Sequence, residues 1–455
     1  MKINPEIFKA YDIRGIYGQD FDDETAYKLG LAYSLFRKKE VKKKKKLRIV
    51  VGEDMRLSSP ALKKKLIKGL ADGGVDVIDI GLASTPTFYF SVAKYACDGG
   101  INVTASHNPR QYNGFKLVRG QARPIGKNTG IYDLRDLVIK GKLLPAKNKG
   151  KVIKNKTAIK DQAKHDLTFA DAKKIKPFKI IIDTANSMGA TYFEELFKHL
   201  KCKIIKMNWK LDGAFPSHEA DPFKPENTKE LRKKVVSQKA DLGIATDGDG
   251  DRIFFVDNKG KLIEPGIIRA ILSKIFLKEK PGAKIAYDIR PGKITEDTIL
   301  ENGGIPIITP VGHSLIKDQA IREGAYFAGE SSGHYFVKMK FGFFEAPMII
   351  TLKILEDLSI SGLSFADYIK PYQKYFHSGE INTRMKNPEA IIKKIKQKYK
   401  DGQQNYLDRI SVEYPDYWFN IRTSNTEPLL RFNLEARTKK LMQEKRDEVL
   451  KIIKG

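Results

Sequence analysis

The amino-acid sequence predicts an α/β protein with three similar α/β domains, built on mixed sheets, and a smaller C-terminal α+β domain around a central cleft. Short apolar segments alternate with amphipathic segments along most of the chain, which is the pattern of strands and helices in α/β folds. One unit of this pattern occurs three times. After about residue 372 the pattern changes to two longer strands and a closing helix, which predicts the smaller domain.

Each repeat starts with an apolar strand that ends in an aspartate, and a helical stretch, a second strand and a third strand follow. The three aspartates are Asp54, Asp183 and Asp288. The second strands are expected at 75–81, 202–208 and 305–312. Each third strand ends in a polar loop, and these loops are SHNP (106–109), DGDGDR (247–252) and GESSGH (329–334). Because ligands gather at the carboxyl ends of strands in open α/β sheets, the loops predict one cleft lined by three domains.

Four domains follow from the three repeats and the changed C-terminal pattern. The predicted ranges are 1–150 for the domain with the SHNP loop, 151–258 for the domain with DGDGDR, 259–372 for the domain with GESSGH, and 373–455 for the smaller domain.

The composition is ordinary for a globular protein, with 41% hydrophobic residues in a chain of 455. No apolar run approaches the ~20 residues of a membrane span. The first residues, MKINPEIFKAYDIRG, lack the apolar region of a secretory signal. With only Cys97 and Cys202, a disulfide framework is not expected. These observations predict a cytoplasmic protein without a membrane partner.

The charge is strongly basic, with 83 lysines and arginines against 55 acidic residues and a net charge of +28. The lysines concentrate at 38–46 and 140–164, without interleaved aromatic residues. No helix-turn-helix, RNP or zinc-finger pattern occurs. We therefore expect no specific nucleic-acid partner, and we interpret the charge as a field that attracts anionic substrates or as solvated lysine-rich faces.

The DGDGDR loop places Asp247, Asp249 and Asp251 at alternating positions of a turn that its glycines keep open. Three converging carboxylates suit a hard divalent cation. A calcium EF-hand is excluded because Arg252 stands where that loop needs glycine and Asn258 where it needs glutamate. Mg²⁺ is favoured because the loop supplies few ligands and leaves room for a phosphate. A phosphatase with an aspartyl nucleophile remains an alternative, since Asp-x-Asp after a strand is also its signature.

Ser106 and His107 stand side by side on a turn that follows an apolar strand. A protease-like triad needs a histidine base held by a carboxylate, and adjacent side chains do not have that relation. No GxSxG elbow occurs either. A serine that carries a phosphoryl group and faces the metal of the next domain uses both loops at once.

Two further polar stretches predict ligand contacts. The stretch RTSNTEPLLR (422–431) offers hydroxyls, an amide and two guanidinium groups, a suitable cradle for a phosphate that does not react. In GESSGH, Glu330 and Ser332 can hydrogen-bond sugar hydroxyls, whereas a lone histidine such as His313 is usually structural.

Six motifs, in order along the whole chain, resemble those of the α-D-phosphohexomutase family, and within it the phosphomannomutase/phosphoglucomutase branch. The motifs are YDIRG (11–15), TASHNPRQYNGFK (104–116), DGDGDR (247–252), GHS (312–314), GESSGH (329–334) and RTSNTEP (422–428). The resemblance implies three similar α/β domains, a smaller fourth domain and a deep central cleft.

The resemblance also implies a mechanism. Ser106 would be the phosphoserine, and Mg²⁺ would be bound by the three aspartates and the serine phosphate. A phosphate would move between C1 and C6 of a hexose through a hexose 1,6-bisphosphate, which also serves as activator. Lys116 would be the general acid/base, with its pKa lowered toward neutrality by burial beside Arg14. His107 and His334 would support the reacting end.

The residues implied to bind the phosphosugar substrate lie in all but the first of the predicted domains. They are Arg252, Arg290, His313, Glu330, Ser332, His334, Arg422, Ser424, Asn425, Thr426 and Arg431. The family resemblance leaves a monomer or a homodimer open.

One loop departs from the family pattern. Many members carry Asp-Asp-Gly or Asp-Ser-Gly before the next helix, whereas this chain reads FGFFEAPM (341–348). Pro347 suits a first helical turn, but Glu345 is a poorer helix cap than aspartate.

The substrate is the least determined feature. The glucosamine branch typically reads SASHNP, whereas this chain has Thr104 in TASHNP. This favours mannose and glucose phosphates, with phosphoglucosamine mutase as the alternative. A metal-dependent sugar phosphatase and a basic binding protein on a mutase scaffold are the alternatives from other classes.

Overall fold

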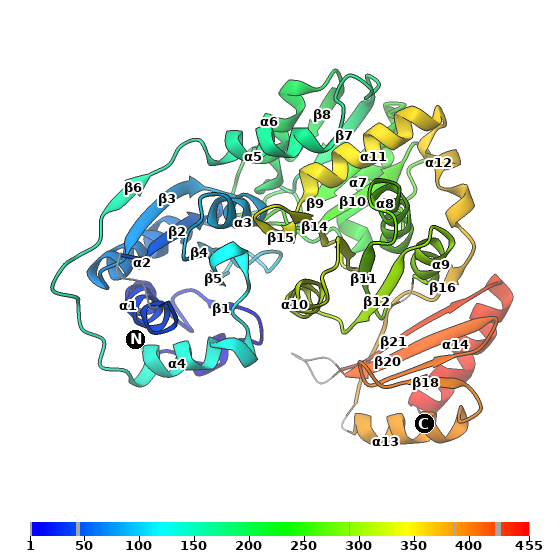
Figure 1. Cartoon of the computed structure of the whole chain (residues 1–455). Coiled ribbons are helices and arrows are strands. Elements are labelled where there is room, and N and C mark those ends of the chain that lie inside the picture. Colours follow the sequence, from blue (N-terminus) through cyan, green and yellow to red (C-terminus); the bar gives the residue numbers. More distant parts are fainter. Residues whose placement is uncertain (1, 42–45, 291, 386, 424–428, 455) are drawn as a thin grey trace. The chain divides into compact units, whose positions relative to one another are not determined.

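The computed structural model describes residues 2–41, 46–290, 292–385, 387–423 and 429–454 (Figure 1). The chain forms two compact units. Unit 1 comprises the residues up to Ile263 together with His334–Ala366, and unit 2 comprises Glu264–Gly333 together with the residues from Asp367 onward. None of the described helices is long and apolar enough to cross a membrane.

The first sheet of unit 1 has the strand order β1-β5-β4-β2-β3-β6. Its strands are β1 Ile13–Ile16, β2 Arg48–Glu53, β3 Asp76–Leu82, β4 Gly99–Val103, β5 Tyr112–Arg119 and β6 Val152–Lys154. The sheet is mixed, because β2 is parallel to both β3 and β4 whereas β5 is antiparallel to β1 and β4. The accompanying helices are α1 Asp23–Glu40, α2 Ser59–Asp72, α3 Thr85–Lys94 and α4 Ile131–Lys140.

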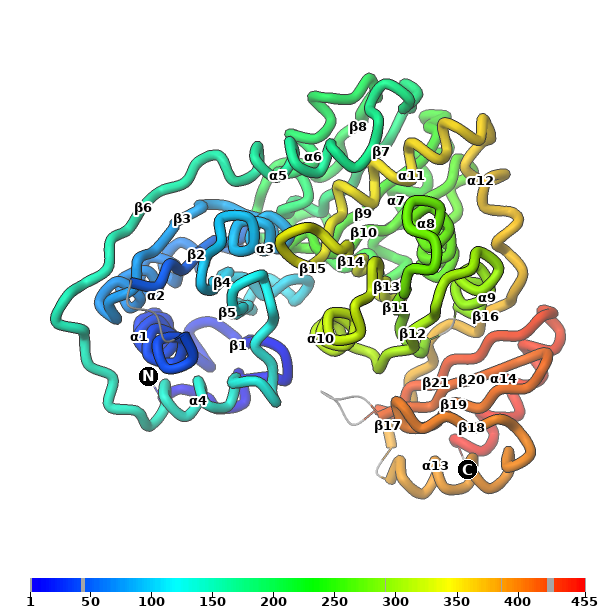
Figure 2. The backbone as a smooth tube through the Cα atoms, in the orientation of Figure 1, coloured from blue at the N-terminus to red at the C-terminus, as the bar shows by residue number. Residues whose placement is uncertain are grey.

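The second sheet of unit 1 has the order β10-β9-β7-β8. Its elements are β7 Lys179–Asp183, β8 Lys203–Met207, β9 Leu242–Thr246 and β10 Ile253–Asp257, with α5 Ala158–Asp166, α6 Gly189–Leu196 and α7 Lys229–Ser237. The backbone trace in Figure 2 shows the long segment between α4 and α5, which contains β6. Unit 1 is completed by the hairpin β14 Tyr335–Met339 and β15 Gly342–Glu345, and by α11 Pro347–Ser361.

Unit 2 contains a parallel three-strand arrangement and an antiparallel C-terminal sheet. The parallel strands are β11 Lys284–Asp288, β12 Ile305–Thr309 and β13 Phe327–Gly329, with α8 Pro265–Glu279, α9 Lys293–Glu301 and α10 His313–Glu323. The C-terminal part consists of β16 Phe376–His377, β17 Ile381–Arg384, β18 Gln403–Asn405, β19 Ile410–Glu413, β20 Tyr417–Thr423 and β21 Leu429–Ala436, with α13 Pro388–Lys398 and α14 Lys439–Lys454. The short helix α12 (Phe365–Tyr368) spans the boundary of the units.

Short 3₁₀ helices complete the described elements. They are η1 Pro5–Ile7, η2 Gly120–Ala122, η3 Lys127–Thr129, η4 Leu167–Phe169, η5 Phe197–His199, η6 Pro225–Thr228 and η7 Lys370–Tyr372.

The threefold repeat read in the sequence is present as a common strand arrangement. In each copy the first strand lies between the third and the second, in the orders β4-β2-β3, β9-β7-β8 and β13-β11-β12, and all neighbours are parallel. The aspartates Asp54, Asp183 and Asp288 stand at the carboxyl ends of the three central strands and are buried. The predicted α/β class, with mixed sheets and a smaller C-terminal domain, is confirmed.

The second strand of the third repeat is shorter than expected. The predicted range was 305–312, but β12 ends at Thr309. Pro310 cannot donate a backbone hydrogen bond, and α10 begins at His313 after Gly312, whose φ is +139°. The strand therefore ends three residues earlier than predicted, and a short turn leads into α10.

The divergent 341–348 loop forms β15 and the start of α11. Pro347 is at the start of the helix, as predicted. Glu345, a poorer cap than aspartate, does not cap this helix: the N-cap is Ala346, which has no side-chain capping bond. Glu345 is instead the buried last residue of β15.

Candidate functional site

The three aspartates of DGDGDR converge in unit 1, in the loop between β9 and β10. One carboxylate oxygen from each of Asp247, Asp249 and Asp251 lies within 4.8 Å of the others, and all three residues are buried. Gly250 has a φ of +73°, a conformation that side-chain-bearing residues rarely adopt. The Asp249 Oδ1 atom is buried with no hydrogen-bond partner among the described residues. An unsatisfied carboxylate oxygen in an acidic cluster fits a divalent cation.

Ser106 lies against this triad. The Ser106 hydroxyl donates to Asp247 Oδ2 at 3.1 Å, and its oxygen is 3.3 Å from His107 Nδ1. The residue follows β4 and has a φ of +51°, stabilised by its backbone N–H, which donates to Thr104 Oγ1 at 2.9 Å. A Cβ atom at Gly248 would lie 2.3 Å from the Ser106 carbonyl oxygen, so only glycine allows the two loops to approach this closely.

The buried side chain of Arg56 supports the serine loop through hydrogen bonds. Its guanidinium group donates to four backbone carbonyls, those of Ser106 at 2.7 Å, Asn108 at 2.6 Å, and Pro109 and Tyr112 at 2.9 Å each. The side chain is fully buried and pairs with Asp54 at 3.2 Å. Sequence reasoning missed this residue. The available signal was the Asp-x-Arg spacing directly after the first strand of the repeat, which recurs at Asp288 and Arg290.

Lys116, on β5, contacts the aspartates directly. Its Nζ atom lies 2.6 Å from Asp249 Oδ2 and 2.5 Å from Asp251 Oδ2. Burial alone would lower the pKa of Lys116, but the carboxylates of Asp249 and Asp251 raise it well above its usual value. The expectation that burial beside Arg14 lowers this pKa toward neutrality is therefore wrong, because the nearest charges are negative.

The pKa values of Asp247 and Asp251 are shifted in opposite directions. Burial, together with the neighbouring Asp251 and Asp249 carboxylates, raises the pKa of Asp247 well above its usual value. Burial also acts to raise the pKa of Asp251, but Lys116 and His334 lower it well below that value. The His334 Nε2 atom lies 3.2 Å from Asp251 Oδ1. The carboxylates of Asp249 and Asp251 are thus compensated by Lys116 on β5, and Asp251 also by His334.

Three further predicted residues, Arg14, Arg252 and His107, lie in or near the serine loop and the aspartate triad. Arg14 donates to Asn108 Oδ1 at 2.9 Å and is held by Asp12 through Nε at 2.7 Å. Arg252 Nε lies 3.7 Å from Asp247 Oδ2. Burial, together with the charges of Arg252 and Arg14, lowers the pKa of His107 well below its usual value. Burial and these charges therefore favour the neutral form of the His107 imidazole, whose Nδ1 atom lies 3.3 Å from the Ser106 hydroxyl oxygen.

Thr85 is a second residue that sequence reasoning missed. Its hydroxyl donates to Asp249 Oδ2 at 2.5 Å, and its backbone N–H donates to the Asp249 carbonyl at 2.9 Å. Thr85 is the first residue of α3, so a helix start orients this aspartate. No motif marks the position, because only the folded chain brings residues 85 and 249 together.

The remaining predicted residues lie in unit 2. Arg290 Nε donates to Asp288 Oδ2 at 2.6 Å, and its Nη2 is 3.5 Å from Glu330 Oε1. Glu330 also accepts from the Ser332 hydroxyl at 3.0 Å and from the Gly312 backbone N–H at 2.9 Å, next to His313. The structure thus brings Arg290, Glu330 and Ser332 together, with His313 next to them in the chain.

The structure describes only some of the residues of the predicted phosphate cradle (422–431). Arg422 and Arg431 both pair with Glu380, at 2.9 Å each. Ser424, Asn425 and Thr426 lie outside the described residues. Glu380 was not anticipated, since it is 42 positions before Arg422 and belongs to no recognised motif.

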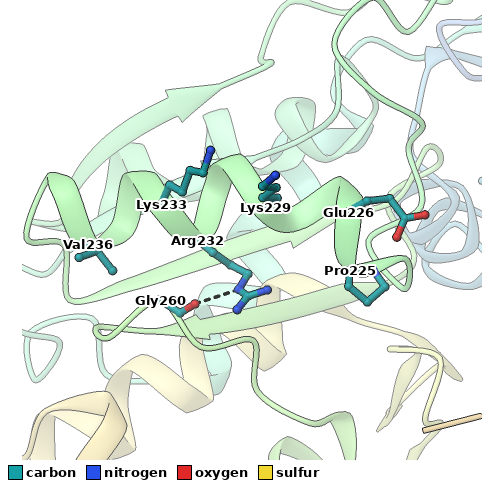
Figure 3. Close-up of a pocket in the computed structure, with 7 residues that line it drawn as sticks. All are labelled: Pro225, Glu226, Lys229, Arg232, Lys233, Val236 and Gly260. Atoms are coloured by element: carbon teal, nitrogen blue, oxygen red, sulfur yellow. Dashed lines mark hydrogen bonds between the residues drawn. The ribbon is translucent and has the colours of Figure 1, made fainter.

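A separate surface groove of about 540 Å³ lies beside α7 (Figure 3). Its lining residues are Pro225, Glu226, Lys229, Arg232, Lys233, Val236 and Gly260. The Arg232 guanidinium is held by the Gly260 carbonyl at 2.9 Å. Because the lining contains no hydroxyl, thiol or imidazole group and none of the predicted residues, we assign no catalytic role to this groove.

Repeated α/β sheets with a serine hydroxyl held against a buried aspartate triad are features of phosphotransferases of the mutase class. The chain matches the four parts of the phosphoglucomutase/phosphomannomutase family. These are alpha/beta/alpha domain I at residues 5–138, domain II at 158–260, domain III at 265–375 and the C-terminal domain at 380–452.

Individual relatives agree along the whole chain. The chain is 38% identical to a phosphomannomutase of Vibrio cholerae serotype O1, with 98% of each chain covered. A phosphoglucomutase/phosphomannomutase family protein of Burkholderia thailandensis matches with a TM-score of 0.87 and 31% identity, covering 99% of this chain and 98% of that one. An Aspergillus fumigatus N-acetylphosphoglucosamine mutase in complex with glucose 1,6-bisphosphate shares the fold, at a TM-score of 0.59 and 14% identity over 100% of this chain and 96% of that one.

The chain therefore belongs to the phosphoglucomutase/phosphomannomutase family of α-D-phosphohexomutases. It is a mutase of the phosphotransferase type.

The Arg56 contacts lead to a first prediction. Arg56→Lys should lower the free energy of unfolding by about 3 kcal/mol, because an ammonium group cannot serve four carbonyls and leaves a buried ion pair impaired. It should also lower kcat, since the Ser106 loop loses its support. Chemical denaturation and initial rates measure the two effects. The exposed Arg123→Lys is the matched control, and a variant at Arg56 as stable as this control would contradict the assignment.

Proposed function

We propose that the chain interconverts hexose 1-phosphates and hexose 6-phosphates, with Ser106 as the phosphate carrier. The single observation that supports this most is the 3.1 Å hydrogen bond between the Ser106 hydroxyl and Asp247, within the buried aspartate cluster. A serine in this place is close to whatever cation the carboxylates bind, which is where a phosphoryl group needs charge compensation.

Asp247, Asp249 and Asp251 would hold Mg²⁺ together with an oxygen on Ser106. The ion would supply charge compensation for the transferring phosphoryl group. The unsatisfied Asp249 Oδ1 atom supports this assignment. The resident Lys116 ammonium lies against two of the same carboxylates, so the cluster already accommodates a cation.

In the proposed cycle, phosphoserine 106 gives its phosphoryl group to the free hydroxyl of a hexose monophosphate. The bond from phosphorus to the serine oxygen breaks as the bond to the sugar oxygen forms, and a hexose 1,6-bisphosphate results. After the intermediate turns over, Ser106 takes the other phosphoryl group back. Lys116 is the proposed proton donor and acceptor: its ammonium form donates a proton to the serine oxygen that leaves phosphorus, and the resulting amine takes the proton that the sugar hydroxyl loses. His107 and Arg14 would orient the serine loop.

Residues of unit 2 are proposed to bind the rest of the ligand. Glu330 and Ser332 would contact sugar hydroxyls, as would His313 and Arg290. The guanidinium groups of Arg422 and Arg431 would hold the phosphate that does not react, together with the 424–426 segment. Hexose 1,6-bisphosphate would serve as activator by phosphorylating Ser106. A cytoplasmic monomer or homodimer remains our expectation.

An isomerisation assay tests the proposal and separates it from its alternatives. A mutase should need a trace of hexose 1,6-bisphosphate and release no inorganic phosphate. A phosphatase that uses an aspartyl nucleophile would release phosphate without that requirement, and a binding protein would do neither.

The carrier role predicts the behaviour of Ser106→Ala. This variant should lose nearly all turnover because it removes the proposed carrier hydroxyl, which donates to Asp247 Oδ2. Intact-mass and peptide mass spectrometry of the wild type should find partial phosphorylation at Ser106. The exposed Ser237→Ala is the control and should keep wild-type activity. Wild-type rates in the Ser106 variant would exclude the mechanism.

The metal role predicts the effect of Asp249→Asn. Replacing one of three carboxylates weakens a hard-cation site, so kcat should fall at least ~10²-fold, as for the loss of one preorganised electrostatic group. Calorimetric titration should show weaker Mg²⁺ binding, and excess chelator should abolish wild-type activity. The exposed Asp136→Asn is the control. Full activity in chelator would rule out the role.

Substrate choice gives the next prediction. Glucose and mannose phosphates differ only at C2, and the proposed contacts of Glu330 and Ser332 are on the part of the ring that they share. A site without a buried polar partner at C2 cannot discriminate strongly there. We expect kcat/KM for glucose 1-phosphate and mannose 1-phosphate to agree within about tenfold, with glucosamine 1-phosphate converted poorly. A clear preference for glucosamine 1-phosphate would reassign the chain within the family.

A further inference from the structure

Two arginines of unit 2 share one carboxylate. Arg422 Nη2 donates to Glu380 Oε2, and Arg431 Nη1 donates to Glu380 Oε1, at 2.9 Å each. The two arginines stand directly opposite each other on the antiparallel strands β20 and β21, an arrangement in which like charges destabilise a sheet. Glu380, just before β17, compensates this repulsion. We call Glu380, Arg422, Arg431 and Arg290 the arginine cluster.

Three of the four side chains in the cluster are largely shielded from solvent, and Glu380 is the carboxylate that both Arg422 and Arg431 contact. The side chains of Arg422 and Glu380 are 6% and 10% exposed. Burial tends to raise the pKa of Glu380, but Arg422, Arg290 and Arg431 together lower it. Burial lowers the pKa of Arg422, and the charge of Arg290 adds to this effect. Glu380 thus pairs with two guanidinium groups, whereas Arg290, whose charge also lowers the pKa of Glu380, pairs with Asp288 and Glu330.

Arg422 has donor capacity that its described neighbours do not use. Its Nε atom is buried with no hydrogen-bond partner among the described residues. A buried, unused N–H of a guanidinium group costs free energy unless an acceptor is bound. An anion that accepted a hydrogen bond from this Nε atom would bind the same guanidinium group whose Nη2 atom donates to Glu380.

We propose that Glu380 is a positioning residue that acts as a built-in competitor of the bound phosphate, orienting Arg422 and Arg431 while weakening their hold on an anion. This inference rests on the proposed function, because the mutase cycle requires the phosphate that does not react to be bound and then released. Interactions equally strong in every state do not speed turnover. Two unopposed guanidinium groups would retain a bisphosphate, whereas a resident carboxylate can pair with Arg422 and Arg431 again as the phosphate leaves.

The test uses the full-length protein, with inorganic phosphate as the probe and Glu380→Gln as the variant. The substitution keeps the size of the side chain and an oxygen acceptor but removes its charge. The dissociation constant for inorganic phosphate, measured by calorimetry, should fall about tenfold or more because the resident anion no longer competes. The gain should disappear when Arg422→Ala is added. Glu413→Gln, which removes a carboxylate paired with Lys293 in the same unit, is the matched control and should leave phosphate affinity unchanged.

Steady-state kinetics provide a second readout that a merely structural role would not produce. In Glu380→Gln both KM and kcat should decrease, since ligand is held more tightly and leaves more slowly. Glu380→Asp keeps the charge and should retain phosphate affinity within about threefold of wild type. Unchanged or weaker phosphate binding in Glu380→Gln, or equal behaviour of the Asp and Gln variants, would overturn the proposal. Tighter phosphate binding in Glu380→Gln without any isomerase activity in the wild type would refute the proposed function alone.

Discussion

The burial of three carboxylates within 4.8 Å of one another is the constraint on which the site in unit 1 depends. Such a cluster is costly unless cations and donors surround it. The chain supplies Lys116 from β5, His334 beside Asp251, and the Thr85 hydroxyl at the start of α3. These partners come from segments far apart in the sequence. The acidic loop, which follows β9 of the second sheet, therefore contacts residues that accompany the first sheet of unit 1.

Each copy of the repeated α/β unit has a buried aspartate at the carboxyl end of its central strand. In the first repeat Asp54 pairs with Arg56, which fixes the carbonyls of the serine loop. In the third repeat Asp288 pairs with Arg290, which reaches Glu330. The second repeat has no such arginine, and Asp183 is instead 3.1 Å from His218 Nε2. The equivalent carboxylate thus supports a functional loop in the first and third copies, whereas in the second copy it contacts His218.

Local sequence signals predicted the strands, the repeat, the acidic triad and the contact of the serine loop with it, because these follow from apolar periodicity and short motifs. The direction of the Lys116 pKa could not be predicted, since it depends on Asp249 and Asp251, more than 130 positions away. Glu380 and Thr85 were missed for the same reason. The strand that ends at Glu345 was not predicted either, because the 341–348 loop departs from the family motif. The domain boundaries stay predictions.

The two groups of charged residues follow one physical rule with opposite signs. In unit 1 an excess of carboxylates surrounds a single lysine, Lys116, and in unit 2 an excess of guanidinium groups surrounds a single glutamate, Glu380. Each minority charge keeps its cluster folded in the absence of ligand, because burying like charges together without it would be unfavourable. The acidic cluster is suited to a cation beside the reacting serine, and the basic cluster to an anion that is held and released. A phosphate dianion can bind directly to the guanidinium groups of the basic cluster. It can lie beside the carboxylates of the acidic cluster only when a metal ion compensates their charge.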